Sequence, residues 1–124
     1  MQKVTFNILN NSKLLNNKIN YFTIIICCKM IRQTTDSPIK NKKYRAYIDN
    51  GKYYDFGLKG SSTYLDHRNI KMRDNYRKRH LGNKIESNLI NNLIMSPSLL
   101  SYYLLWGPYT ELDENIKFLN NLMK

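Results

Sequence analysis

The sequence predicts an α+β fold: an N-terminal β-hairpin, a basic helix and a small C-terminal helical cluster. Three observations support this prediction. Asn50-Gly51 lies between two runs of strand-forming residues, residues 62–81 are strongly basic, and residues 97–106 are almost entirely apolar. We expect one small α+β domain over residues 43–124, preceded by a flexible or spurious N-terminal extension, residues 1–42.

Residues 1–29 differ in composition from the rest of the chain. They contain no Asp, Glu, Gly, Pro, Ala, Arg, Trp or His, and Asn, Lys, Ile and Leu dominate. We therefore hypothesise that translation starts at Met30. The alternative is an additional strand within this segment, because it is rich in β-branched residues. Residues 31–42 are polar and without periodicity, and are predicted to be a flexible lead-in.

The chain is strongly basic, with 20 Lys and Arg, 9 Asp and Glu, and a net charge of +11. Such an excess favours an anionic partner, namely nucleic acid, anionic lipid or an acidic protein surface. Solubility alone is the competing interpretation. The adjacent pair Cys27-Cys28 does not fit a structural disulfide, and the apolar run around it is too short to span a membrane. We expect a soluble, intracellular protein.

Asn50-Gly51 predicts a two-residue hairpin turn of type I′. That turn would place Ile48 opposite Tyr53, and Tyr47 opposite Tyr54. Aromatic side chains would then stand on both faces of the hairpin. One face would pack on the helices, and the other could stack with nucleic-acid bases. The simpler interpretation is that tyrosine forms strands well.

A helix is predicted from an N-cap at Ser62 or Thr63 to about Leu81, with Gly82 as its stop. Its apolar seam is narrow and comprises Leu65, Asn69, Met72 and Tyr76. Cations cover the remaining surface, so this helix is the best candidate for phosphate contact. The predicted nucleic-acid-binding residues are Arg68, Lys71, Arg73, Arg77, Lys78, Arg79 and His80. The alternative is a solvated face paired with the acidic last helix.

Three further helical segments follow. Residues 83–95 show helical spacing of apolar residues, and Ser96-Pro97 is a helix start signal. The helix over residues 97–106 should be the buried core element, with Trp106 in the core. Thr110 is predicted to cap the last helix, with Asp113 completing a capping box. The seam of that helix is Leu112, Ile116, Leu119 and Met123.

The sequence does not predict a catalytic site, a metal site or a cofactor. His67 and His80 are 13 residues apart, which in one continuous helix turns them about 140° from each other. They could not share a metal in that geometry. The glycines at 57 and 60 do not form a P-loop, because the following Lys-Ser/Thr is missing. A small metal-dependent nuclease, with His67 in its site, remains the least favoured alternative.

Residues 43–80 carry a motif that resembles a family of small basic proteins encoded by large nucleocytoplasmic (giant) DNA viruses. The family pattern is K-Y, N-G-K, F-G-x-K-G, Y-x-x-H, R-x-x-Y-x-x-R-H and, later, L-W. The matching residues are Lys43-Tyr44, Asn50-Gly51-Lys52, Phe56-Gly57, Lys59-Gly60, Tyr64, His67, Arg73, Tyr76, Arg79-His80 and Leu105-Trp106. The resemblance implies a viral protein in the host cytoplasm, at the viral factory, and in the virion. It implies no enzyme activity.

The residues and the resemblance together predict a small, basic, non-catalytic viral protein that binds nucleic acid through phosphate contacts. DNA rather than RNA is the expected nucleic acid. The alternative is a virion structural protein, in which the basic helix meets an acidic surface of another virion protein. Neither interpretation predicts an oligomeric state.

Overall fold

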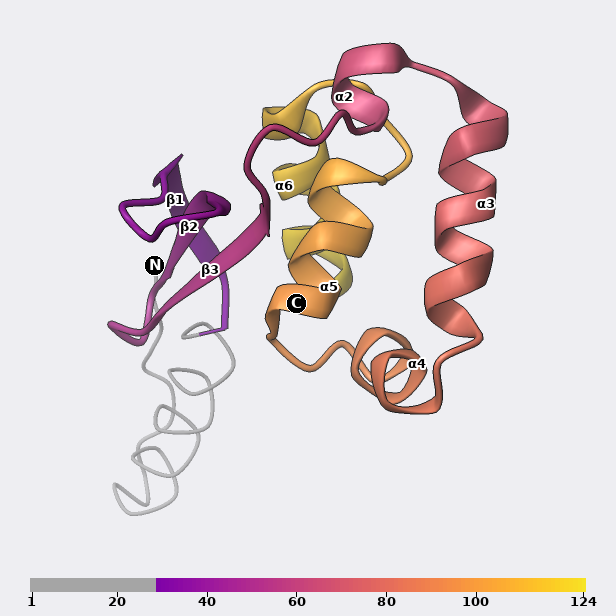
Figure 1. Cartoon of the computed structure of the whole chain (residues 1–124). Helices are drawn as coiled ribbons and strands as arrows, with labels where there is room; N and C mark the ends of the chain where they lie inside the picture. The colour runs from indigo at the N-terminus through magenta and orange to yellow at the C-terminus, as the bar shows by residue number, and fades with distance from the viewer. Residues whose placement is uncertain (1–28) are drawn as a thin grey trace, which may run out of the picture.

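The computed structural model describes residues 29–124 and has the predicted α+β architecture, with a three-stranded antiparallel sheet followed by helices (Figure 1). The strands lie in the order β1–β2–β3. They are β1 (Ile31–Asp36), β2 (Lys42–Ile48) and β3 (Tyr53–Leu58). The helices are α2 (Tyr64–His67), α3 (Ile70–Leu81), α4 (Lys84–Asn91), α5 (Pro97–Leu100), the π-helical segment η1 (Ser101–Leu105) and α6 (Leu112–Leu122).

Strand β1 corrects the prediction that residues 31–42 form a flexible lead-in. It pairs antiparallel with β2, with Thr34 opposite Ala46. Only Ile31 is buried in this strand, so it lacks the alternation that identifies a strand from sequence. Residues 31–36 therefore form a strand because they pair with β2, and not because of a local sequence pattern. The prediction for residues 1–28 lies outside the described residues.

The β2–β3 turn is one residue longer than predicted, which shifts the hairpin register. The Ile48 N–H donates to the Lys52 carbonyl at 2.9 Å, and only Gly51 in the turn has a positive φ, of 89°. This is the three-residue loop with a left-handed glycine, not a type I′ turn. Tyr47 therefore lies opposite Tyr53, and the predicted pairing with Tyr54 is wrong.

The observed register separates a core face from a solvent-facing face of the sheet. Ala46, Ile48 and Phe56 point to the core and are fully or almost fully buried. On the other face, Arg45 lies opposite Asp55 and forms an ion pair at 2.9 Å. This bond to Arg45 is the main reason that the pKa of Asp55 is lowered.

The predicted continuous helix over residues 62–81 is broken into α2 and α3. Arg68 has a positive φ of 55°, and Asn69 caps α3 by accepting the Met72 N–H at 3.0 Å. An Asn side chain that accepts the backbone N–H three residues further along the chain competes with continuation of the preceding helix. The predicted start and stop are confirmed, because Thr63 is the N-cap of α2 and Gly82 is the C-cap of α3.

The C-terminal helices form the core, as predicted. Leu99, Leu100, Leu104 and Leu105 of α5 and η1 are fully or almost fully buried, and Ser96 caps α5 by accepting the Leu99 N–H. Trp106 is 9% exposed and belongs to the core cluster. In Figure 1, α5 and η1 lie between the sheet and α3, with α6 behind them.

The predicted cap of the last helix is wrong, although the helix itself is confirmed. The N-cap of α6 is Glu111 and not Thr110, and its side chain makes no capping hydrogen bond. The buried amide of Asn115 bonds the preceding loop instead, by accepting the Tyr109 N–H at 2.9 Å. In residues 29–124, no helix is both long enough and apolar enough to cross a lipid bilayer.

Candidate nucleic-acid interface

Helix α3 faces the core with cationic and aromatic side chains rather than aliphatic ones. The residues on its inner side are Arg73, Tyr76, Arg77 and His80, which follow the i, i+3, i+4, i+7 spacing of one helix face. No residue of α3 is buried, and Met72, which was predicted to lie in an apolar seam, is 49% exposed. The predicted seam is therefore only partly right: Leu65 and Tyr76 pack against the core, whereas Asn69 and Met72 are exposed because the helix breaks before Ile70.

A column of four aromatic rings joins α2 and α3 to the core. The ring of Tyr76 lies parallel to that of Trp106, with centroids 4.3 Å apart and a 7° angle between the planes. His80 covers the other face of Tyr76 at 4.0 Å, and His67 lies 5.4 Å from Trp106. Burial raises the pKa of Tyr76 to about 12, so its hydroxyl keeps its proton at neutral pH.

Two of the predicted phosphate-binding arginines have partners inside the protein. Arg77 donates from Nε to the Trp106 carbonyl at 2.7 Å, and its guanidinium lies 4.6 Å from the ring centre of Tyr102. Arg73 pairs with Asp74 at 3.0 Å and lies over the ring of Tyr64. The contacts with Trp106, Tyr102 and Tyr64 hold α3 in place, whereas the pair with Asp74 lies within α3 itself.

The other cations of the predicted site are exposed, and we call them the α3 basic face: Arg68, Lys71, Lys78 and Arg79. Lys71 and Lys78 are seven residues apart, so they lie on the same side of α3, about 10 Å from each other. Within residues 29–124, neither forms an ion pair. Arg68 is 3.7 Å from Glu111, but both side chains are more than half exposed, so this pair contributes little to stability.

The two histidines have separate environments, so they do not form one site. His80 Nδ1 lies 2.6 Å from Glu86 Oε1, which links α3 to α4. His67 Nδ1 accepts the Asn69 N–H at 3.0 Å, and its buried Nε2 has no hydrogen-bond partner. Among residues 29–124, no three His, Cys, Asp or Glu side chains lie close enough to hold a metal ion. Cys27 and Cys28 lie outside the described residues.

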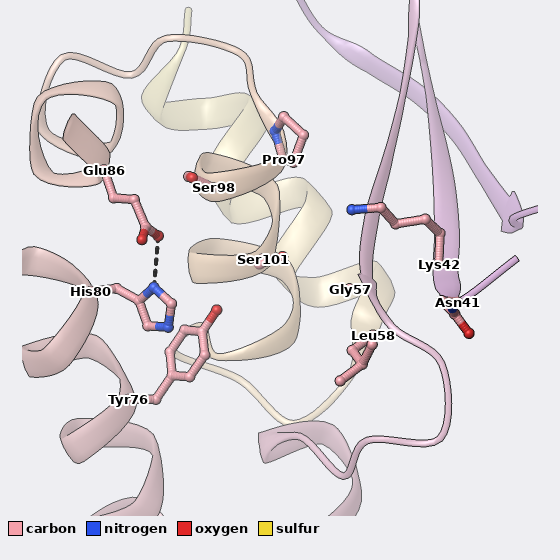
Figure 2. Close-up of a pocket in the computed structure, with 10 residues that line it drawn as sticks. All are labelled: Asn41, Lys42, Gly57, Leu58, Tyr76, His80, Glu86, Pro97, Ser98 and Ser101. Carbon is pink, nitrogen blue, oxygen red and sulfur yellow. Dashed lines mark hydrogen bonds and ion pairs between the residues drawn. The ribbon is translucent and has the colours of Figure 1, made fainter. Parts of the chain in front are cut away.

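A pocket of about 410 Å³ lies on the inner side of α3, between this helix and the ends of β2 and β3 (Figure 2). Lys42, Leu58, Tyr76, His80, Glu86 and Ser98 line it, together with four further residues. Of these, the sequence predicted a binding role only for His80. Because the lining residues come from separate elements across the fold, a motif search could not have assembled them.

Comparison with known proteins gives one match. Residues 33–80 match the model of a family of unknown function (DUF5754). The matched segment covers most of the sheet, α2 and most of α3, and it ends at His80. No curated protein and no solved structure matches the chain.

Proposed function

We propose that this protein binds nucleic acid without catalysis, through contacts between the α3 basic face and the phosphate backbone. The observation that carries the proposal is the pair Lys71 and Lys78, which project from one side of a helix that is fixed to the core by its opposite side. Fixed cations lose less conformational entropy on binding than cations on a mobile segment. The net charge of +11 adds long-range attraction for a polyanion.

The structure divides the seven predicted contact residues by what each side chain meets. In the proposal, Arg68, Lys71, Lys78 and Arg79 contact phosphates. Arg73, Arg77 and His80 position α3 instead, because their side chains are partly buried and meet Tyr64, Trp106 and Glu86 of other elements, whereas the contacts of Arg68 and Arg79 are solvent-exposed. Phosphate contacts carry no sequence information directly, so we expect weak sequence preference.

The test is a binding titration of duplex DNA at several salt concentrations. In the double variant Lys71→Gln/Lys78→Gln, the slope of log K against log salt should shrink by about 1.8, because each lost phosphate contact removes about 0.9. Lys52→Gln is the matched control, since Lys52 is an exposed lysine next to the β2–β3 turn. Its slope should stay close to that of the natural protein.

Two results would refute the proposal. One is an affinity that does not fall with salt, or no binding at low salt. The other is an equal change of slope per charge removed in the Lys52→Gln control and the double variant, which would show that net charge rather than the basic face determines binding.

A structural protein of a large DNA virus is the second candidate function. It is supported by two exposed apolar side chains, Ile70 of α3 at 57% and Ile85 of α4 at 76% exposure, which another protein could cover. The viral origin rests on the motif in residues 43–80. Retention of the protein on purified virus particles after nuclease digestion would support this candidate, and release with the nucleic acid would support the first.

A further inference from the structure

The pocket on the inner side of α3 brings together groups from both parts of the fold. Lys42 reaches it from β2 and Leu58 from β3, while Tyr76 and His80 come from α3 and Ser98 from α5 (Figure 2). Its volume of about 410 Å³ is within the range of small-molecule sites. The α3 basic face lies on the other side of the helix, so this pocket is separate from the proposed nucleic-acid interface.

Several groups that can donate hydrogen bonds line this pocket. Figure 2 shows the Lys42 ammonium extending from the sheet side, while the Tyr76 hydroxyl extends from the helical side. Within the described residues, Lys42 forms no ion pair. Burial raises the pKa of the Tyr76 hydroxyl to about 12. The Ser98 hydroxyl adds a further donor.

Glu86 is the one carboxylate among the lining residues, and it is already engaged. Its Oε1 lies 2.6 Å from His80 Nδ1, so this carboxylate oxygen already has a partner within the protein. Since an ionised carboxylate only accepts hydrogen bonds, Nδ1 carries a proton.

Leu58 and Pro97 form the apolar part of the wall, while Asn41 and Ser101 add two further polar side chains. The Leu58 side chain is 62% exposed beside the donors, and Pro97 lies on the helical side. A ligand that fits both parts of the wall combines an anionic, acceptor-rich group with an organic portion. The donors approach from opposite walls, which suits a tetrahedral anion better than a planar carboxylate, and lysine is a common partner of phosphate.

We propose that this pocket binds a phosphate monoester, with the phosphate on Lys42 and Ser98 and the organic portion against Leu58. Two sources share this chemistry: a free nucleotide and the 5′-phosphate at the end of a nucleic-acid strand. The proposal does not depend on the basic face. Lys71 and Lys78 can fail as phosphate contacts while the pocket still binds its ligand.

The test is calorimetric titration of the full chain with adenosine 5′-monophosphate, with adenosine as the matched ligand without phosphate. We expect the nucleotide to bind and adenosine to bind at least about tenfold more weakly. Lys42→Gln and Ser98→Ala should each weaken nucleotide binding by about tenfold. Lys52→Gln removes the same charge next to the β2–β3 turn, and should leave nucleotide binding unchanged.

Equal binding of adenosine and the nucleotide would overturn the proposal. So would no binding of the nucleotide at millimolar concentration, or equal losses in Lys42→Gln and Lys52→Gln. Circular dichroism of both pocket variants checks that they fold.

A second titration separates the two sources, using one short single strand with either a 5′-phosphate or a 5′-hydroxyl. A preference for the phosphorylated strand that Lys42→Gln abolishes identifies the strand end as the ligand. Binding of the free nucleotide without such a preference identifies the nucleotide.

Discussion

Asn115 shows how a single buried polar residue holds two helical segments together. Its side chain is fully buried, and its amide nitrogen donates to the Leu104 and Tyr109 carbonyls at 3.0 and 2.9 Å. Its oxygen accepts the Tyr109 N–H. Every polar atom of the amide therefore has a partner, as burial requires. These bonds fix the turn between η1 and α6.

Gly107 belongs to the same turn and leaves no room for a side chain. A Cβ atom there would overlap the Tyr103 carbonyl oxygen and lie 2.9 Å from Asn115 Oδ1. A backbone carbonyl cannot rotate away as a flexible side chain can. Gly107→Ala should therefore lower the free energy of unfolding by at least the roughly 1–3 kcal/mol typical of overpacking, as measured by urea denaturation.

Gly82→Ala is the matched control for this substitution. Gly82 has a φ of −75°, and its Cβ would lie 3.4 Å from the nearest atoms. We expect a small stabilisation of about 0.4–1 kcal/mol, because alanine restricts the unfolded chain. Equal stability of the two variants would contradict the packing described at Gly107.

Among the elements, α3 has the least usual attachment to the core. Amphipathic helices normally bury aliphatic side chains, whereas α3 packs through Tyr76 and His80 and through its arginines. The stacked pair of Tyr76 and Trp106 is its central contact. Aromatic pairs contribute about 0.5–1.5 kcal/mol beyond the area that they bury.

We predict that Tyr76→Leu loosens α3 without unfolding the sheet, because the substitution removes the ring between Trp106 and His80. Hydrogen exchange should become faster in α3 and stay unchanged in β2 and β3. Trp106 is the one Trp of the chain, so its fluorescence reports on the same contact.

Tyr53→Leu makes the same substitution on the solvent-facing side of the sheet, where Tyr53 is 52% exposed. It should leave both readouts at α3 unchanged. If α3 amides exchange equally in Tyr76→Leu and the natural protein, the ring column does not hold this helix.

At the level of elements, local signals in the sequence predicted most of the fold. Ser96-Pro97, Gly82 and the apolar run to Trp106 predicted the helices, because caps and periodicity act within a few residues. The errors arose where two local choices are close in energy. Asn50-Gly51 fits turns of two and of three residues, and the Arg45–Asp55 pair formed in the observed register favours the longer one. Asn69 could equally continue a helix or cap a new one.

The candidate site was predictable only in part, for a related reason. Charge and helical periodicity identified the cations of residues 68–79, but not which of them face inward. That orientation depends on the break at Arg68 and on Trp106, which is 30 residues from Tyr76. The pocket depends on Lys42, Tyr76 and Ser98 meeting in space, which no local pattern encodes.

Across the whole molecule, the first and last described elements are joined directly. The Asn120 side chain of α6 accepts the Ile31 N–H at 2.9 Å and donates to the Ile31 carbonyl at 3.0 Å. These two bonds imitate a neighbouring strand at the outer edge of β1. They satisfy backbone groups that would otherwise lie unpaired beside the core.

We predict that Asn120→Ala lowers the free energy of unfolding by about 1–3 kcal/mol, since it leaves both backbone groups of Ile31 without partners. Thermal or urea denaturation measures the change. Asn121→Ala is the control from the same helix, because Asn121 is exposed. Its effect should stay below about 0.5 kcal/mol, as for most surface substitutions. Equal effects of the two would show that Asn120 does not brace β1.

The link between Ile31 and Asn120 also bears on the order of folding. The two residues are 89 positions apart, whereas β2 and β3 are joined by a short turn. Closing so long a loop costs more chain entropy, so this contact should form after the transition state. Its loss should then mainly accelerate unfolding and leave the rate of folding nearly unchanged. The two hydrogen bonds between Ile31 and Asn120 should thus determine the lifetime of the folded molecule, which depends on the unfolding rate, rather than the rate at which it folds.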